Sequence, residues 1–278
     1  TGAALELVKP AIGGWPVTDR VVSNHPDHLA ETSDEIDELI SGWGQDCTDG
    51  SRGDLAAVLL DRPGVERYPY HFVSTPLWGC YDLWGFEGMM VMIASRPARV
   101  EYACRRLLDL RLRTVRQAAS LGAAGLWIED CYSDMISPAA FEAFNVRFLR
   151  PLVEEIRALG MDSIHYFCGN PAGKWDLIRS IGADALALEE SKKGFAIDIE
   201  EIVSRVGGQM TVLGNLDAIG ILQDGSEEQL RAEIARQIAA GRQNGSRFIM
   251  SIGSPVTPAT PVERVRLYCD LAHELGSA

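Results

Sequence analysis

The sequence lacks a long apolar run and lacks a cluster of basic residues. Its most apolar stretch, Gly88-Met-Met-Val-Met-Ile-Ala94, is far shorter than the ~20 residues that a membrane-spanning helix requires. Lysine and arginine number 26 against 39 aspartates and glutamates, and the formal net charge is -13. Basic residues occur only in pairs such as Arg105-Arg106 and Lys192-Lys193, so we expect no nucleic-acid partner and no membrane partner. The negative charge favours solubility.

Paired cysteine spacing and a signal peptide are also lacking. The six cysteines are scattered along the chain, a pattern that is typical of reduced thiols in the cytoplasm. The chain begins at Thr1 without a methionine, and we therefore expect that part of the native N-terminus has been removed.

What the sequence does contain is a regular alternation of strands and helices. Five apolar strand segments, each followed by a helical segment, are expected at residues 125–129, 163–168, 185–189, 210–214 and 248–251. Short links between such units imply a parallel sheet, and no Gly-x-Gly-x-x-Gly fingerprint supports an open, doubly wound one. With 278 residues, against ~250 for a typical barrel, the pattern predicts an α/β fold of the (β/α)8 TIM-barrel class.

Local signals mark where several helices begin. Ser137-Pro138 predicts an N-cap followed by a proline in the first turn, and capping boxes are expected at Ser226 and at Thr260. A helix is also expected from Pro97 to Leu121. A buried stripe is predicted for the helix after Ser137, formed by Phe141, Phe144, Phe148, Leu152 and Ile156.

The N-terminal third is less regular. We expect one barrel domain over residues 1–278, with an irregular part at 1–75 and regular β/α units at 76–278. Ala56–Leu60 and Tyr70–Val73 are candidate strands, residues 42–51 a loop, and Leu83–Ala94 is ambiguous between helix and strand.

Polar side chains occur where the predicted strands end, and in a barrel those carboxyl ends form the active face. The candidates are Glu129, Asp130, His165, Tyr166, Cys168, Glu189, Glu190, Asn215, Asp217 and Ser254. Each one alone could be polar because it emerges into water, but five polar strand ends together favour a functional site.

Glu, His and Cys are ligands that zinc accepts, so we expect a Zn2+ site formed by Glu129, His165 and Cys168. The geometry of a regular strand argues against joint ligation by two of these residues. His165 and Cys168 are three residues apart and point to opposite faces of a regular strand, whereas Tyr166 and Cys168 share a face. Joint ligation would require a bulge.

Three motifs resemble the uroporphyrinogen decarboxylase superfamily: Tyr166-Phe-Cys-Gly-Asn170, Leu213-Gly-Asn-Leu-Asp217 and Gly253-Ser-Pro-Val-Thr-Pro-Ala-Thr-Pro261. The resemblance runs from about Pro76 to the end of the chain and implies a (β/α)8 barrel. The chain departs from the decarboxylases, because it has no Arg-Gln-Ala-Gly-Arg string and carries Ser254 where they place a histidine.

The coenzyme M methyltransferases of the superfamily bind zinc through His-x-Cys-Gly and a later cysteine. Here Tyr166 stands at their histidine position and Ser254 at their late cysteine. The segment from Glu189 to Ile199 looks most similar to the first methyltransferases of bacterial O-demethylase systems. That resemblance implies transfer of a methyl group from a small aromatic methyl ether to the cobalt of a corrinoid, which a partner protein supplies.

Under this hypothesis the residues take distinct roles. A metal held by Glu129, His165 and Cys168 polarises the leaving oxygen. Without a metal, Tyr166 or Glu190 donates a proton to it. Trp127 and Tyr166 stack on the ring. Asn215 and Asp217 bind a ring hydroxyl or orient the metal ligands, and Asp130, Glu189 and Ser254 are expected to contact the substrate.

Three alternatives stay open. One is a zinc-dependent methylcorrinoid:thiol or folate methyltransferase, which needs an activated thiolate acceptor. Another is a decarboxylase similar to uroporphyrinogen decarboxylase. The third is a non-catalytic tetrapyrrole-binding protein, which would not require so many ionisable groups at one rim.

Overall fold

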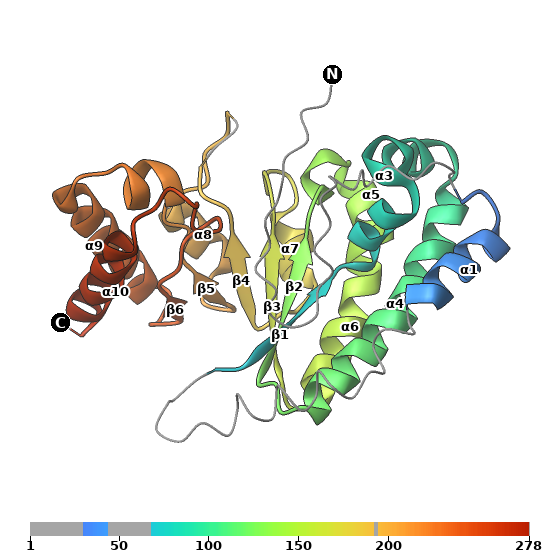
Figure 1. The fold of residues 1–278 in the computed structure, drawn as a ribbon, viewed down its shortest axis with the longest axis horizontal. Coiled ribbons are helices and arrows are strands. Elements are labelled where there is room, and N and C mark those ends of the chain that lie inside the picture. Colours follow the sequence, from blue (N-terminus) through green and yellow to red (C-terminus); the bar gives the residue numbers. More distant parts are fainter. Residues whose placement is uncertain (1–29, 44–67, 192–193, 278) are drawn as a thin grey trace.

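The computed structural model of the protein describes residues 30–43, 68–191 and 194–277 (Figure 1). The candidate strand Ala56–Leu60, most of the loop expected at 42–51, and the pair Lys192-Lys193 lie outside the described residues. Among the described residues no helix is both long enough and apolar enough to cross a membrane.

Within the described ranges, a parallel sheet of six strands forms the centre of the molecule, and these strands follow one another in sequence order. The strands are β1 Tyr70–Ser74, β2 Gly125–Asp130, β3 Asp162–Phe167, β4 Ala185–Leu188, β5 Thr211–Leu213 and β6 Phe248–Ile249. All five predicted strands are present, together with the candidate at Tyr70–Val73, and every adjacent pair is parallel as expected. Sequential parallel order is how a β/α barrel wall is built.

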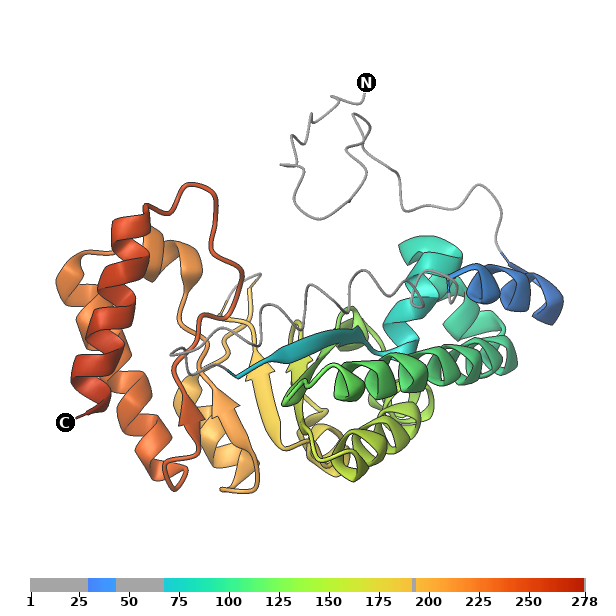
Figure 2. The ribbon, with the colours of Figure 1, turned by 60° about the horizontal axis from the view of Figure 1, so that its bottom comes forward.

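Helices connect the strands and cover one side of the sheet (Figure 1). They are α1 Ser33–Trp43, α3 Pro76–Ser95, α4 Pro97–Ser120, α5 Pro138–Phe141, α6 Arg147–Ala158, α7 Trp175–Ser180, α8 Ile199–Val206, α9 Glu227–Gln243 and α10 Val262–Gly276. A 3-10 turn, η2 Ser133–Met135, and two π turns, η3 Glu142–Val146 and η4 Ala218–Gln223, complete the described elements. Figure 2 shows α9 and α10 side by side at the end of the molecule opposite α1.

Helix signals in the sequence were mostly reliable. Leu83–Ala94, which the sequence left ambiguous, lies within α3. The Ser137 hydroxyl accepts a hydrogen bond from the Ala140 N–H, and Ser226 forms the predicted capping box with Gln229. The box predicted at Thr260 is wrong, because α10 begins after Pro261 and has no side-chain cap.

The two faces of the sheet differ in character, because successive strand residues point to opposite sides. Leu126 and Ile128 of β2 and Leu186 of β4 face the helices and belong to the main core. The opposite, concave face carries a small cluster of Ile164, Ala185, Ala187 and Leu213, against which Trp127 and Tyr166 pack. The predicted stripe of the helix after Ser137 is fully in the main core.

The capping box of α9 generates a stability prediction. Ser226→Ala removes the acceptor for the Gln229 N–H, and we expect unfolding free energy to fall by about 1 kcal/mol. Ser226→Asp keeps an acceptor and should lie within about 0.5 kcal/mol of the wild type. Urea denaturation monitored by circular dichroism measures both, and equal losses for the two variants would contradict this role.

Candidate functional site

The concave face of the sheet bounds a pocket of about 1490 Å³. Its lining includes six aromatic residues: Tyr68, Tyr70, Trp127, Tyr132, Tyr166 and Phe195. Carboxyl groups also line it, from Glu129, Asp134, Asp162, Asp184 and Glu189, and the described lining residues include no lysine or arginine. The pocket therefore suits an aromatic molecule or a cation better than a polyanion.

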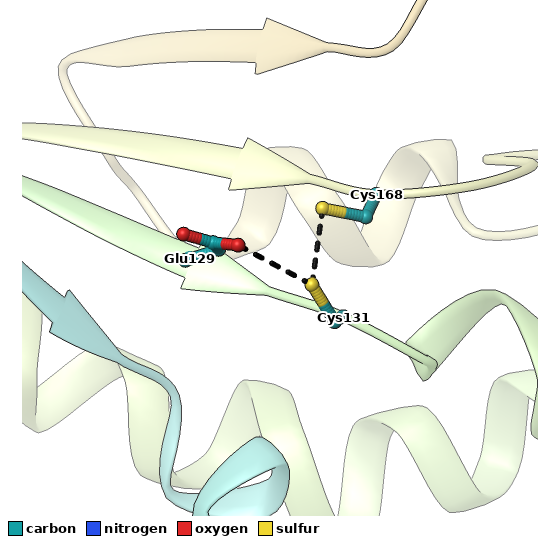
Figure 3. A group of neighbouring side chains, drawn as sticks. All are labelled: Glu129, Cys131 and Cys168. Atoms are coloured by element: carbon teal, nitrogen blue, oxygen red, sulfur yellow. Dashed lines mark hydrogen bonds between the residues drawn. The ribbon is translucent and has the colours of Figure 1, made fainter. Parts of the chain in front are cut away.

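Two cysteines and a glutamate meet in this pocket at the carboxyl ends of β2 and β3 (Figure 3). The Cys131 Sγ lies 3.2 Å from the Cys168 Sγ and 3.6 Å from the Glu129 Oε1, and the three donor atoms lie within 4.8 Å of one another. We call these three residues the thiol–carboxylate cluster. Carboxylate and thiolate are ligand types that zinc accepts, so the cluster has the chemistry of a metal site.

Strand register explains why these side chains meet. Glu129 and Cys131 are two residues apart and so project to the same face. Asp130 of β2 is paired with Phe167 of β3, so the next residue of each strand, Cys131 and Cys168, follows directly beside the other.

Both strands leave the sheet through unusual backbone conformations immediately after the cluster. Tyr132 has a φ of 65°, a left-handed conformation that is uncommon for a residue other than glycine. Gly169 has a φ of 101°, and a Cβ there would overlap the Asp134 carboxyl group. Such strained turns concentrate at functional sites, where the surrounding structure holds them in place.

Burial and mutual contact suppress ionisation in the cluster. The hydrogen bond between the Cys168 and Cys131 thiols, together with burial, favours the neutral Cys168 thiol and raises its pKa far above that of an ordinary thiol. Burial raises the pKa of Glu129, although the Cys131 hydrogen bond opposes this shift. Both shifts favour the protonated form of the group relative to the same group exposed to water.

Aromatic rings line up beside the cluster. The Trp127 ring lies 5.0 Å from the Tyr166 ring and 6.1 Å from the Tyr70 ring, measured between centroids. The Tyr166 hydroxyl donates a hydrogen bond to the Gly253 carbonyl at 2.8 Å, and burial raises its pKa strongly. A proton held in this way is poorly suited to transfer, so this geometry favours Tyr166 as part of the wall rather than as an acid.

The structure does not bring His165 to the predicted metal site, and this part of the prediction needs correction. His165 is fully buried on the helix-facing side of β3, where its Nε2 lies 3.0 Å from the Asp130 Oδ2. Asp130 is likewise fully buried on that side and is not among the residues that line the pocket. The cause is the strand alternation that already opposed joint ligation by His165 and Cys168.

Three further predicted residues lie outside the described pocket lining. Asn215 is buried and donates hydrogen bonds to the Glu189 and Ile197 carbonyls, so it braces the loop after β4. The Asp217 carboxylate accepts from two backbone N–H groups and caps η4. Glu190 is buried and packs against Gly253, where a Cβ would overlap it.

The pocket lining includes six of the predicted residues: Trp127, Glu129, Tyr166, Cys168, Glu189 and Ser254. Sequence reasoning missed Cys131 as a site residue. The available signal was its spacing, because a cysteine two residues after Glu129 must share its face if the strand continues.

Comparison with known proteins shows the family of the chain. The sequence profile of the uroporphyrinogen decarboxylase (URO-D) family matches residues 72–275. Uroporphyrinogen decarboxylase from Neisseria meningitidis is 28% identical over 209 residues, which cover 71% of this chain and 56% of that protein. The same enzyme from Anaeromyxobacter is 25% identical over 81% of this chain and 62% of that protein. The chain thus spans little more than half the length of the curated relatives it matches.

Solved structures give the fold independently. A methyltransferase from Methanosarcina mazei matches 80% of this chain and 63% of its own, with a TM-score of 0.70 and 18% identity. A B12-independent methionine synthase from Shewanella matches 81% and 65%, with a TM-score of 0.56 and 9% identity. Together with the strand order, these matches confirm the predicted TIM-barrel class of α/β fold. The chain belongs to the uroporphyrinogen decarboxylase family, and its structural neighbours include a methyltransferase.

The raised pKa of the Cys168 thiol generates a reactivity prediction. An ordinary thiol has a pKa of about 8.5. Because the pKa of Cys168 is raised, iodoacetamide should alkylate Cys168 slowly at about pH 8.5 in chelator-treated protein. The exposed Cys269 serves as the internal comparison. Mass-spectrometric peptide mapping over a pH series measures both rates, and half-maximal alkylation of Cys168 below pH 8.5 would contradict the raised pKa.

Proposed function

We propose that the chain is a methyltransferase that moves a methyl group from a methoxylated aromatic compound to the cobalt of a corrinoid carried by a partner protein. The observation that carries this proposal is the thiol–carboxylate cluster next to an aromatic wall in one pocket. Trp127 offers a face for the ring of the substrate, and the cluster lies further along the same face of β2.

Glu129, Cys131 and Cys168 are proposed to hold a zinc ion, because their donor atoms lie within 4.8 Å of one another and thiolate and carboxylate suit zinc. A zinc ion bound there would act as a Lewis acid on the ether oxygen. The set replaces the one expected from the sequence, with Cys131 in place of His165.

The reaction requires that the methyl–oxygen bond breaks with its electron pair remaining on oxygen, while the methyl carbon accepts an electron pair from the reduced cobalt. The leaving phenolate is basic and needs a proton or positive charge close to its oxygen. A Glu129 carboxylate oxygen lies within 4.8 Å of both sulfurs, and Glu129 supplies either a ligand or a proton. Tyr70, Trp127 and Tyr166 orient the ring and exclude water.

Glu189 and Ser254 remain candidates for contacts to ring substituents, because both line the pocket. Asn215, Asp217 and Glu190 are proposed to act from behind the pocket, by fixing the loops that carry those contacts.

A second candidate function is methyl transfer from a methylated corrinoid to a thiol. The observation that favours it is the second sulfur of the cluster. Ser254 stands where the coenzyme M methyltransferases carry their late cysteine, and Cys131 would supply the second thiolate instead. Decarboxylation of a porphyrinogen is less well supported, because carboxylates and no basic residues occur in the described lining, where a polyanion would need positive charge.

Removal of a cluster sulfur tests the proposal. Cys131→Ser should lower methyl transfer from vanillate-like or veratrole-like ethers by about 100-fold or more, since a Lewis acid contributes several kcal/mol. Absorbance of the methylated corrinoid protein reports turnover, and Cys269→Ser, an exposed change on α10, should behave as the wild type.

Two results would contradict the proposal. Wild-type rates in Cys131→Ser would exclude the cluster from the reaction. No transfer by wild-type protein from any ether in a broad panel, with transfer from methylated corrinoid to a small thiol, would favour the second candidate.

Metal analysis provides a separate prediction. Purified wild-type protein should contain about one zinc per chain, and Cys131→Ser or Cys168→Ser should lose most of it, because a zinc site needs its protein ligands. Elemental analysis after gel filtration measures this ratio. Zinc content that is unchanged in both serine variants would place the metal elsewhere.

A further inference from the structure

A group of polar side chains is completely buried behind the thiol–carboxylate cluster, on the opposite face of the sheet. Asp130, Ser133, Asn145 and His165 each have an exposed fraction of 0%. The Asp130 carboxylate accepts hydrogen bonds from the Ser133 hydroxyl and from the Asn145 Nδ2 at 2.7 Å, and the His165 Nε2 lies 3.0 Å from it. The Asn145 Nδ2 also donates to the Ser133 Oγ at 2.9 Å. We call these four residues the buried tetrad.

Packing alone does not require this group. The tetrad lies among apolar side chains such as Phe141 and Phe167, whose rings are 5.8 Å apart, and the His165 ring lies 6.2 Å from that of Phe167. A buried carboxylate is costly unless several donors satisfy it, and an apolar residue would fill the same space. The three contacts to the Asp130 carboxylate fix the relative positions of the elements that carry them.

The tetrad connects four elements that converge on the two sulfurs. Asp130 ends β2, Ser133 begins η2, Asn145 lies in the π turn η3 and His165 lies in β3. The π turn interrupts the long helix and is a local feature that frequently occurs at functional sites. It presents Asn145 to Asp130, and the left-handed Tyr132 places Ser133 within reach of the same carboxylate.

Asp130 is linked to the cluster by its position in the chain and by a backbone hydrogen bond. Asp130 stands between Glu129 and Cys131 in the chain, so holding its side chain on one face directs both neighbours to the other. The Cys168 N–H donates to the Asp130 carbonyl at 2.9 Å, which fixes the ends of β2 and β3 relative to each other.

We propose that the buried tetrad positions the thiol–carboxylate cluster, with Asp130 and His165 acting as positioning residues that keep the Cys131 and Cys168 sulfurs close enough to bind one thiophilic centre. Its link to catalysis rests on the proposed function. The spatial claim about the two sulfurs stands on the structure of β2 and β3 alone.

Phenylarsine oxide tests the spatial claim without zinc, corrinoid or substrate, because trivalent arsenic binds tightly only where two thiols lie close together. Chelator-treated protein is titrated with this reagent and, separately, with Zn2+. Cys131→Ser sets the background from the other thiols, including the fully buried pair Cys80 and Cys104. The variants are Asp130→Asn, Asn145→Ala and the milder Ser133→Ala.

We expect the affinities of Asp130→Asn and Asn145→Ala for both probes to fall by tenfold or more, and that of Ser133→Ala by a smaller factor. Asn244→Ala is the matched control. Asn244 is also buried and bridges the Met210 and Arg247 carbonyls, at the other end of the sheet. It should lower the thermal midpoint while leaving both affinities unchanged.

Each outcome is decisive. Wild-type affinities in the cooperatively folded Asp130→Asn and Ser133→Ala variants would overturn the positioning role and leave the proposed function untouched. If Asp130→Asn fails to fold, wild-type affinities in Ser133→Ala and Asn145→Ala would overturn it equally. Arsenical binding that depends on the tetrad, in a wild-type protein that binds no Zn2+, would support positioning and count against the proposed metal site.

Discussion

The alternation of side chains along β2 is the constraint on which the site depends. Trp127, Glu129 and Cys131 project into the concave pocket, while Ile128 and Asp130 project towards the helices. A shift of one residue in the pairing of β2 with β3 would exchange the two sets. The thiol–carboxylate cluster and the buried tetrad are therefore two sides of one strand register.

Electrostatics reinforces this division. The pocket collects carboxyl groups in a chain whose net charge is -13, and the described lining residues contribute no lysine or arginine. Such a pocket attracts cations and disfavours polyanions. Burial raises the pKa of Glu129, and contact with Cys131 together with burial raises that of Cys168.

Much of this arrangement could be predicted from the sequence, because it depends on local periodicity. Parallel strands, their order and the convergence of Glu129 with Cys168 follow from strand–helix alternation and from the rule that barrel strands end at one face. The side of the sheet on which His165 lies could be predicted from the alternation of side chains along a regular strand. Whether β3 is regular or contains a bulge at this point required the structure. The partners of Asp130 could not be predicted, since Asn145 reaches it through a π turn that leaves no clear sequence signal.

The backbone contacts of two predicted site residues have a common physical origin. Asn215 and Asp217 are polar residues after a strand, and sequence alone cannot separate a side chain that binds a ligand from one that satisfies backbone groups. Both proved to serve the backbone. Cys131 was missed because its strand continues further than the apolar pattern indicates, and only that continuation puts it beside Cys168.

The most direct test of the central claim is X-ray absorption at the zinc edge on the zinc-loaded wild-type protein. A site formed by Glu129, Cys131 and Cys168 predicts two sulfur neighbours at about 2.3 Å, with the remaining positions occupied by oxygen at about 2.0–2.2 Å. A first shell without sulfur, or one that contains a histidine nitrogen, would contradict the account.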